Sequence, residues 1–378
     1  MGTGFSITIT GLYMILSFKD KRLYAIKEKI ETNTRLDHND GLTLFDTNDL
    51  IGVGALADYV RRKRHGNKTY YVYNQHINYT NICKNRCLFC AFARDRHEKG
   101  AYMYSVKQVR DILIQNKNDR LKEIHMVGGI HPNAPFEYYL DLLHTIREVR
   151  PDIHIKAFTA VEIDHFSSIS ELSLTETIKA LKKAGLNMVP GGGSEVMSNR
   201  IHQELFPKKI HWSRWAEVMK AVHAQGITSN ATMLYGHIET PSERITHLSQ
   251  LRKIQDETNG FTAFIPLAFH SENTKLSHIP PTSAYLDLKI TAIARLILDN
   301  FDHIKAYWVM LGEKLAQIAQ TFGADDLDGT IIDEKITHSA GARSSKGLTR
   351  DQLINMIRSA GFEPVERDAL YQPVRSNP

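Results

Sequence analysis

The sequence predicts an α/β protein built as a (β/α)8 TIM-type barrel with an N-terminal helical extension. Three observations support this prediction: eight apolar β-type runs recur along the chain, helix-period segments separate them, and glycines and ionisable residues follow directly after most runs. In such a barrel the chemistry lies at the carboxyl ends of the strands. The same pattern therefore indicates where a functional site would form.

The eight predicted strands alternate with helices whose ends can be read from the sequence. The strands span residues 70–77, 123–127, 153–161, 186–190, 227–235, 261–269, 304–311 and the weaker 327–332. Ser173 and Glu176 form the capping box of one helix, which closes at Gly185. A second helix covers 213–226. A third, within 283–301, repeats apolar residues at i, i+3, i+4 and i+7, and so presents one face to a sheet.

The chain divides into three predicted segments. Residues 1–69 form the helical extension, 70–345 the barrel, and 346–378 a C-terminal helix and tail that pack on the barrel. No Pro- or Ser-rich linker separates these segments. A single domain with additions at both ends is therefore expected.

Composition excludes several function classes. Hydrophobic residues make up 42% and charged residues 24% of 378 residues, which is typical of a soluble globular protein. The net charge of +5 suits a small acidic substrate, and the basic run 61–68 has no aromatic platform beside it, so no nucleic-acid partner is expected.

An apolar run lies within residues 4–22. At about fourteen residues it is too short to span a bilayer, and it lacks the basic segment and cleavage site of a secretory signal. We interpret it as packed structure or as extra residues ahead of a natural start at Met14. A cytoplasmic protein without a membrane partner is expected.

All three cysteines of the chain, Cys83, Cys87 and Cys90, lie within eight positions. They could be small buried residues on one helix face, or ligands of a zinc ion completed by His76 or His97. An odd number of cysteines argues against a disulfide framework. The favoured interpretation is an iron–sulfur cluster held by three thiolates, which leaves one of four irons without a protein ligand.

The spacing C-x3-C-x2-C, with Phe89 before the last cysteine, resembles the signature of radical S-adenosylmethionine (SAM) enzymes. The resemblance implies a 4Fe-4S cluster on Cys83, Cys87 and Cys90. It also implies that SAM chelates the open iron and that a donor such as flavodoxin or ferredoxin reduces the cluster. The rim residues that it assigns to SAM are Phe89, Gly128, Gly129, Glu162, Gly191 and Gly192.

Longer stretches resemble the aminofutalosine synthases of menaquinone biosynthesis, among them "INYTNICKNRCLFCAFAR", "AFIPLAFH" and "AYWVMLG". This resemblance implies a transferase that adds the 5′-deoxyadenosyl radical to 3-[(1-carboxyvinyl)oxy]benzoate. The products would be 6-amino-6-deoxyfutalosine, methionine and bicarbonate, with SAM consumed as a co-substrate. Two alternatives are a radical SAM cyclase acting on a dehypoxanthine futalosine-type substrate, and a zinc-stabilised nucleic-acid-binding module.

The implied aromatic substrate carries two carboxylates, for which charge-assisted hydrogen bonds are the strong partners. We therefore predict substrate contacts from rim residues, namely Arg86, His237, His270 and His338. The chemistry requires no protein nucleophile. Groups that could handle protons or stabilise a ring-centred radical are His270, Glu239 and Tyr307. A homodimer is left open.

Overall fold

The computed structural model describes residues 17–332 and 334–374. The apolar run near the amino terminus and the question of a start at Met14 lie almost entirely outside these residues. Within the described ranges, no helix combines the length and apolar character needed to cross a membrane.

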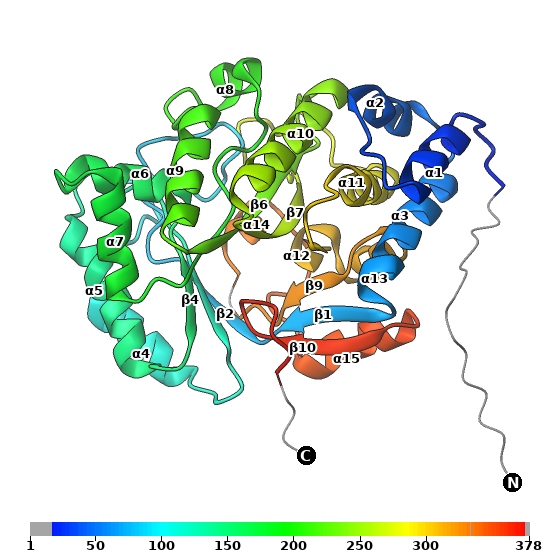
Figure 1. Cartoon of the computed structure of the whole chain (residues 1–378). Helices are drawn as coiled ribbons and strands as arrows, with labels where there is room; N and C mark the ends of the chain where they lie inside the picture. The colour runs from blue at the N-terminus through cyan, green and yellow to red at the C-terminus, as the bar shows by residue number, and fades with distance from the viewer. Residues whose placement is uncertain (1–16, 333, 375–378) are drawn as a thin grey trace, which may run out of the picture.

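A curled sheet of seven parallel strands forms the centre of the molecule, with helices around it (Figure 1). Its strands follow one another in chain order, as expected of successive βα units with short connections. They are β2 (Asn74–Ile77), β3 (Glu123–Met126), β4 (His154–Ala157), β5 (Met188–Val189), β6 (Thr228–Tyr235), β7 (Phe261–Ala268) and β8 (His303–Ile304).

The eighth position of the barrel is filled by residues 326–332, which include β9 (Asp326–Gly329). Asp326 bridges to Lys305 just after β8, and Ile332 bridges to Gln75 on β2, so this segment runs between the first and last strands of the curled sheet. Single bridges, rather than a full ladder, close the gap. The predicted barrel class is confirmed, and the weak eighth run lies at its closing position.

The predicted first strand, 70–77, is wrong as a single element. It consists of β1 (Lys68–Val72) and β2, and β1 belongs to a separate three-stranded sheet in the order β10-β1-β9, where β10 is Glu363–Arg367. The run has no glycine or proline at the break. Its hydrophobic pattern therefore did not reveal that the chain changes sheets at Tyr73.

Two other predicted strands end earlier than expected. The run 153–161 leaves the sheet after Ala157 and becomes α6 (Ala160–Ile169), because Thr159 caps this helix and accepts a hydrogen bond from the backbone of Glu162. The run 304–311 is β8 followed by the short helix α12 (Trp308–Leu311). In both cases an apolar run with no turn signal conceals a change from strand to helix.

Helices surround the sheet and cover its outer face (Figure 1). They are α4 (Val106–Gln115), α5 (Phe136–Val149), α6, α7 (Leu174–Ala184), α8 (Asn199–Leu205), α9 (Trp212–Ala224), α10 (Pro241–Thr258), α11 (Ala284–Ile297), and α13 (Glu313–Ala319) with the 3-10 turn η1 (Gln320–Phe322). The short helix α14 (Ile336–Ser339) lies instead at the cavity described below. The predicted capping box of Ser173 and Glu176 is present at α7, and Gly185 ends this helix in the left-handed conformation.

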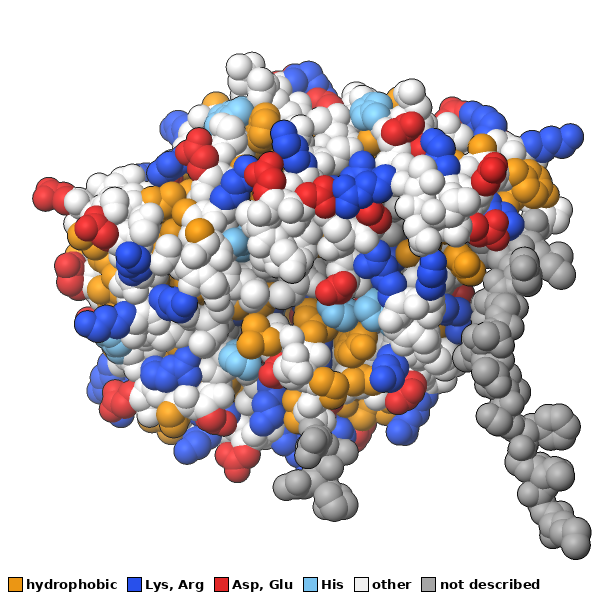
Figure 2. All heavy atoms as spheres, viewed as in Figure 1, with side chains coloured by type: hydrophobic (Ala, Val, Ile, Leu, Met, Phe, Trp, Pro, Cys, Tyr) orange, Lys and Arg blue, Asp and Glu red, His pale blue; other side chains and the backbone are white. Residues whose placement is uncertain are grey.

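The segments before and after the barrel pack on the α11 side and along the second sheet. Helices α1 (Leu23–Glu31), α2 (His38–Asp46) and α3 (Leu50–His65) precede β1, and α3 packs against α11. Helix α15 (Arg350–Ser359) packs against β10, which pairs in parallel with β1 (Figure 1). On the face drawn in Figure 2, basic and acidic side chains are interspersed rather than gathered by sign.

Candidate active site

A cavity of about 350 Å³ opens at the carboxyl ends of the strands. It is lined by residues from the loops after β2, β3 and β5, from β6 and β7, and from the segment around α14. The structure brings most of the predicted rim residues together here: Cys83, Cys87, Phe89, Cys90, Gly128, Gly129, Glu162, Gly191, Gly192, His270 and Tyr307.

The cysteine loop between β2 and α4 is held by backbone hydrogen bonds. Cys83 donates to the carbonyl of Arg94 at 3.1 Å, Cys90 donates to that of Cys87 at 3.1 Å, and Leu88 donates to Leu205 on α8 at 2.9 Å. The loop is therefore fixed at both ends and at its middle, so that all three thiols line the same cavity.

The thiols suit ligation of an inorganic cluster better than ligation of one ion. Burial raises the pKa of Cys87 to about 12 and also raises that of Cys90, so both need a metal to become thiolates. Sulfurs around a single zinc lie about 3.8 Å apart. Within the described part of the chain, no group that includes these cysteines brings three ligand atoms within 4.8 Å. A cluster of several irons spans such a wider triangle.

Glu162 organises the wall next to the cysteines. Its Oε1 accepts hydrogen bonds from the Tyr79 hydroxyl at 2.7 Å and the Gly128 backbone at 3.1 Å, and its Oε2 accepts from the backbone and hydroxyl of Thr159. Burial raises the pKa of this carboxyl, and these donors oppose the shift. Glu162 therefore positions the Gly128 backbone that lines the cavity.

The glycines of the wall are required for different reasons. A Cβ at Gly129 would stand 2.4 Å from the Ile82 carbonyl oxygen, and one at Gly191 would stand 2.5 Å from that of Asn230, so the backbone of the protein itself excludes a side chain there. At Gly192 a Cβ would meet only the Thr159 methyl, at 3.7 Å. Only Gly192 keeps cavity space open without a packing reason.

Phe89 forms part of a small, partly buried cluster beside the cysteines. Its ring packs edge-on against Phe206 with centroids 5.8 Å apart, and Lys209 Nζ lies 5.4 Å from its centre. Lys209 forms an ion pair with Glu195, and both line the cavity. The sequence did not reveal this charge pair beside the thiols: Glu195 ends the segment after the predicted strand 186–190, but Lys209 lies 14 residues further on and follows no predicted strand.

His270 and Tyr307 lie on the β7–β8 side of the cavity. The Nε2 of His270 is 2.9 Å from the Met310 carbonyl, so this nitrogen carries the proton and Nδ1 is the acceptor. Burial raises the pKa of Tyr307 well above its usual value. The phenol therefore stays protonated and is a hydrogen-bond donor rather than a base.

Four other predicted residues lie outside the cavity lining. The carboxylate of Glu239 is held by His237 and Arg244, which keep its pKa at about 2 against the effect of burial. His338 bonds to Glu334 and to the Ser344 carbonyl, and Arg86 pairs with Glu98. The structure does not bring Glu239, His237, His338 or Arg86 to the site, because each has a structural partner nearby.

Inside the barrel, below the rim, the cavity is lined by His76, His125, Lys156 and Asp328. From the sequence, His76 was a candidate only as a zinc ligand, and the other three were not predicted to belong to the site. They occupy the strands themselves rather than the segments that follow them. Only the inward direction of their side chains, which the pairing of the strands decides, makes them part of the site.

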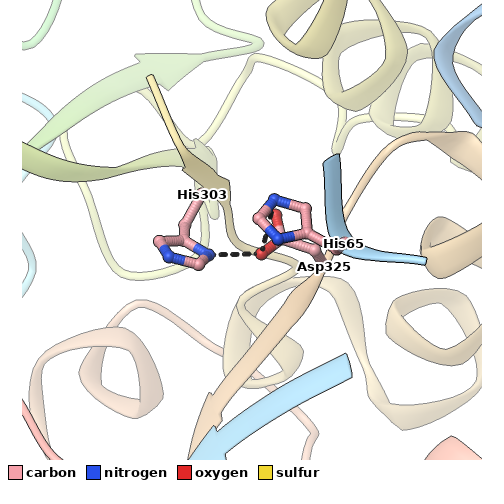
Figure 3. A group of neighbouring side chains, drawn as sticks. All are labelled: His65, His303 and Asp325. Carbon is pink, nitrogen blue, oxygen red and sulfur yellow. Dashed lines mark hydrogen bonds and ion pairs between the residues drawn. The ribbon is translucent and has the colours of Figure 1, made fainter. Parts of the chain in front are cut away.

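A separate titratable group lies away from the cavity, where His65, His303 and Asp325 approach one another (Figure 3). His303 Nδ1 is 2.5 Å from the Asp325 carboxylate, which also accepts from Arg295 and from the Ile304 backbone. The group joins α3, β8 and the residue before β9. Because the buried Arg295 already pairs with this carboxylate, the group is poorly suited to a cation.

Comparison with known families identifies two matching regions. Residues 77–251 match the model described as the radical SAM superfamily, and residues 258–378 match the CofH/MqnC C-terminal region. Together they cover the cysteine loop, strands β3 to β8 of the barrel, and strands β9 and β10 of the second sheet.

Named relatives align with nearly the whole chain. An aminodeoxyfutalosine synthase of Thermus thermophilus is 45% identical over 94% of this chain and 97% of its own length, and one of Streptomyces coelicolor is 37% identical over 93% of each. A 5-amino-6-(D-ribitylamino)uracil–L-tyrosine 4-hydroxyphenyl transferase of Methanopyrus kandleri is 36% identical over 93% of this chain and 95% of its own.

Among solved structures, methylornithine synthase (PylB) has a TM-score of 0.72 at 18% identity, covering 90% of this chain and 97% of that one. The hydrogenase maturase HydG has a TM-score of 0.71 at 16% identity, covering 93% and 77%. At these identities the likeness establishes the fold alone.

Proposed function

This chain belongs to the radical SAM superfamily, in the group that contains the aminodeoxyfutalosine synthases, and from that premise we propose that it is a transferase that joins the 5′-deoxyadenosyl group to 3-[(1-carboxyvinyl)oxy]benzoate. The products would be 6-amino-6-deoxyfutalosine, methionine and bicarbonate. The observation that carries the proposal is one cavity lined by three thiols near the rim and, further inside the barrel, by His76, His125 and Lys156. The 45% identity to a synthase of that name supports it.

Cys83, Cys87 and Cys90 would hold a 4Fe-4S cluster, which with SAM supplies a 5′-deoxyadenosyl radical once a donor such as flavodoxin or ferredoxin delivers an electron. The protein itself would position the nucleoside. Gly128, held by Glu162, and the open wall at Gly192 would let the nucleoside approach the main chain.

The remaining lining residues would orient the aromatic substrate and exclude water. Apolar side chains of β6 and β7, including Leu234, Ile265 and Leu267, form the wall against which a flat ring would pack. Tyr307 would donate a hydrogen bond to an oxygen of the substrate, and His270 Nδ1 would accept one or hold a proton. Exclusion of water protects a radical from side reactions.

The test is direct. Cluster-reconstituted protein, reduced under anaerobic conditions and given SAM with the enol ether, should form the adenosyl adduct and methionine, measured by mass spectrometry. If free 5′-deoxyadenosine were the only nucleoside product, the proposal would be wrong. A cytoplasmic location follows from the reducing conditions that such a cluster requires and is part of the proposal.

A second candidate is transfer of a 4-hydroxyphenyl group from tyrosine. The 36% identity to proteins named for that reaction, over 93% of this chain, favours it. Supplying L-tyrosine and 5-amino-6-(D-ribitylamino)uracil in place of the enol ether separates the two candidates. Under our proposal this pair gives no coupled product.

A further inference from the structure

The strand pairing aligns three basic side chains across the inner cavity. His76 on β2 is the register partner of His125 on β3, and His125 is the partner of Lys156 on β4. Since side chains alternate along a strand, Asn78 and Val127, two residues further on, also line the cavity and mark the next layer toward the rim. We call His76, His125 and Lys156 the basic row.

Among the described residues, the two imidazoles of the basic row have no hydrogen-bond partner. Their ring centroids lie 4.4 Å apart. The Nε2 of His76 is buried and unsatisfied. An unpaired buried polar atom costs free energy unless a ligand or water completes it. At a cavity wall, such an atom indicates a polar ligand.

The permanent positive charges in and behind the basic row are already paired. Lys156 pairs with Glu123 at 2.6 Å, Lys305 with Asp328 at 3.4 Å, and Arg367 with Asp326 at 2.6 Å. These pairs come from β4 and β3, from the end of β8 and β9, and from β10 and β9. An anion that entered this region would therefore be uncompensated, unless a positive charge were created with it.

The imidazoles are the groups that can create this charge. Burial lowers the pKa of His76, while Asp328, Glu334 and Glu123 act in the opposite direction and Lys156 reinforces the shift. Burial, with the charges of His76, Lys156 and Lys305, lowers the pKa of His125 well below its usual value. Both rings are thus neutral at neutral pH, and a carboxylate alongside would favour the charged form.

We propose that the basic row binds the ring carboxylate of the aromatic substrate and that one proton enters the site with it, converting an imidazole to an imidazolium. The inference rests on the proposed function for the identity of the ligand. The orientation of the bound substrate follows from the position of the basic row along the strands. His125 lies three residues before Gly128, roughly 10 Å at 3.3 Å per residue, so the vinyl end reaches the nucleoside at the rim and the ring carboxylate lies inside.

The experiment is calorimetric titration of the cluster-loaded protein with 3-[(1-carboxyvinyl)oxy]benzoate, with SAM present and no reductant, so that no turnover occurs. Repeating it in buffers with different ionisation enthalpies measures the protons bound. At neutral pH we expect uptake close to one proton per ligand. Affinity should fall, by up to tenfold per pH unit, as the pH rises above the free imidazole pKa.

Two variants and one altered ligand locate the effect. His125→Gln should weaken binding roughly 10- to 100-fold and remove most of the proton uptake, and His76→Gln provides the same measurements if the first variant does not fold. His223→Gln is the matched control, because His223 is half-buried like the two imidazoles of the basic row but lies outside the cavity, bonded to Thr258 and Ser229. Replacing the ring carboxylate by a carboxamide should abolish uptake on wild-type protein.

The outcomes separate the two proposals. If wild-type protein forms the adenosyl adduct but binds its substrate without proton uptake, or if the carboxamide ligand takes up the same number of protons, the basic row is not the carboxylate site and the inference is overturned while the function stands. If wild-type protein neither binds the enol ether nor converts it, both are overturned.

Discussion

Two adjacent glycines, Gly191 and Gly192, should respond in opposite ways to the same substitution. Both line the cavity after β5. In Gly191→Ala the new Cβ would lie 2.5 Å from the Asn230 carbonyl oxygen and 2.6 Å from the Ala231 Cα, which are backbone atoms of β6. In Gly192→Ala the nearest atom is a methyl carbon 3.7 Å away, an ordinary contact.

The magnitudes follow from these distances. Because backbone cannot rotate aside as a side chain does, Gly191→Ala must move β5 away from β6, and overpacking of this kind costs about 1–3 kcal/mol. Gly192 does not have a left-handed φ, so alanine there restricts the unfolded chain and adds about 0.4–1 kcal/mol of stability. The expected fall in melting temperature for Gly191→Ala is roughly 1–4 °C.

Thermal unfolding of the two variants, followed by circular dichroism on matched samples, measures the difference. Gly192→Ala should melt at or slightly above the wild-type temperature, yet bind SAM several-fold more weakly in equilibrium titration, because its methyl group occupies cavity space. Equal melting temperatures for the two variants would refute the steric reasoning. Unchanged SAM affinity in Gly192→Ala would remove this residue from the proposed nucleoside wall.

Three further predictions concern the cluster, the wall and the response to acid. Cys87→Ala should lose the brown colour and nearly all bound iron after reconstitution while keeping its helical circular dichroism; retained iron and activity would contradict the assignment of this ligand. Tyr79→Phe removes the 2.7 Å hydrogen bond to buried Glu162 and should lower the free energy of unfolding by about 1–3 kcal/mol, measured with urea. Burial lowers the pKa of His247 to about 4. The stability that the neutral imidazole contributes is therefore fully present above pH 6.5 and is lost as the pH falls toward 4. Between pH 7 and pH 5 the free energy of unfolding, measured with urea, should fall by about 2 kcal/mol more in wild type than in His247→Gln.

The fold class was predictable because it depends on repetition. Alternating apolar runs and amphipathic segments specify βα units, and such units have essentially one way to close. Boundaries were less predictable. The change of sheet at Tyr73 and the change from strand to helix after Ala157 occur within apolar runs. When such a run is buried on both sides, its residues are apolar whether they form a strand or a helix, so the hydrophobic pattern does not mark the boundary.

The candidate site was predictable where chemistry is local. Three thiols within eight positions must lie near one another in any fold, and glycines after strands reach the rim of any barrel. Charged rim residues were harder to assign. His237, Glu239 and Arg244 satisfy one another through hydrogen bonds and ion pairs, and a sequence does not show which of several nearby charges pair.

The order of the strands, the crowding of the thiols and the small residues after β3 and β5 were set by the sequence alone, since each depends on neighbours along the chain. The inner end of the cavity was decided by the tertiary structure. His76, His125 and Lys156 are 49 and 31 positions apart in sequence, and they form one row only because three strands pair in a register that turns all of them inward. Register is set by packing of the whole barrel, and a shift of one residue would turn the same side chains outward.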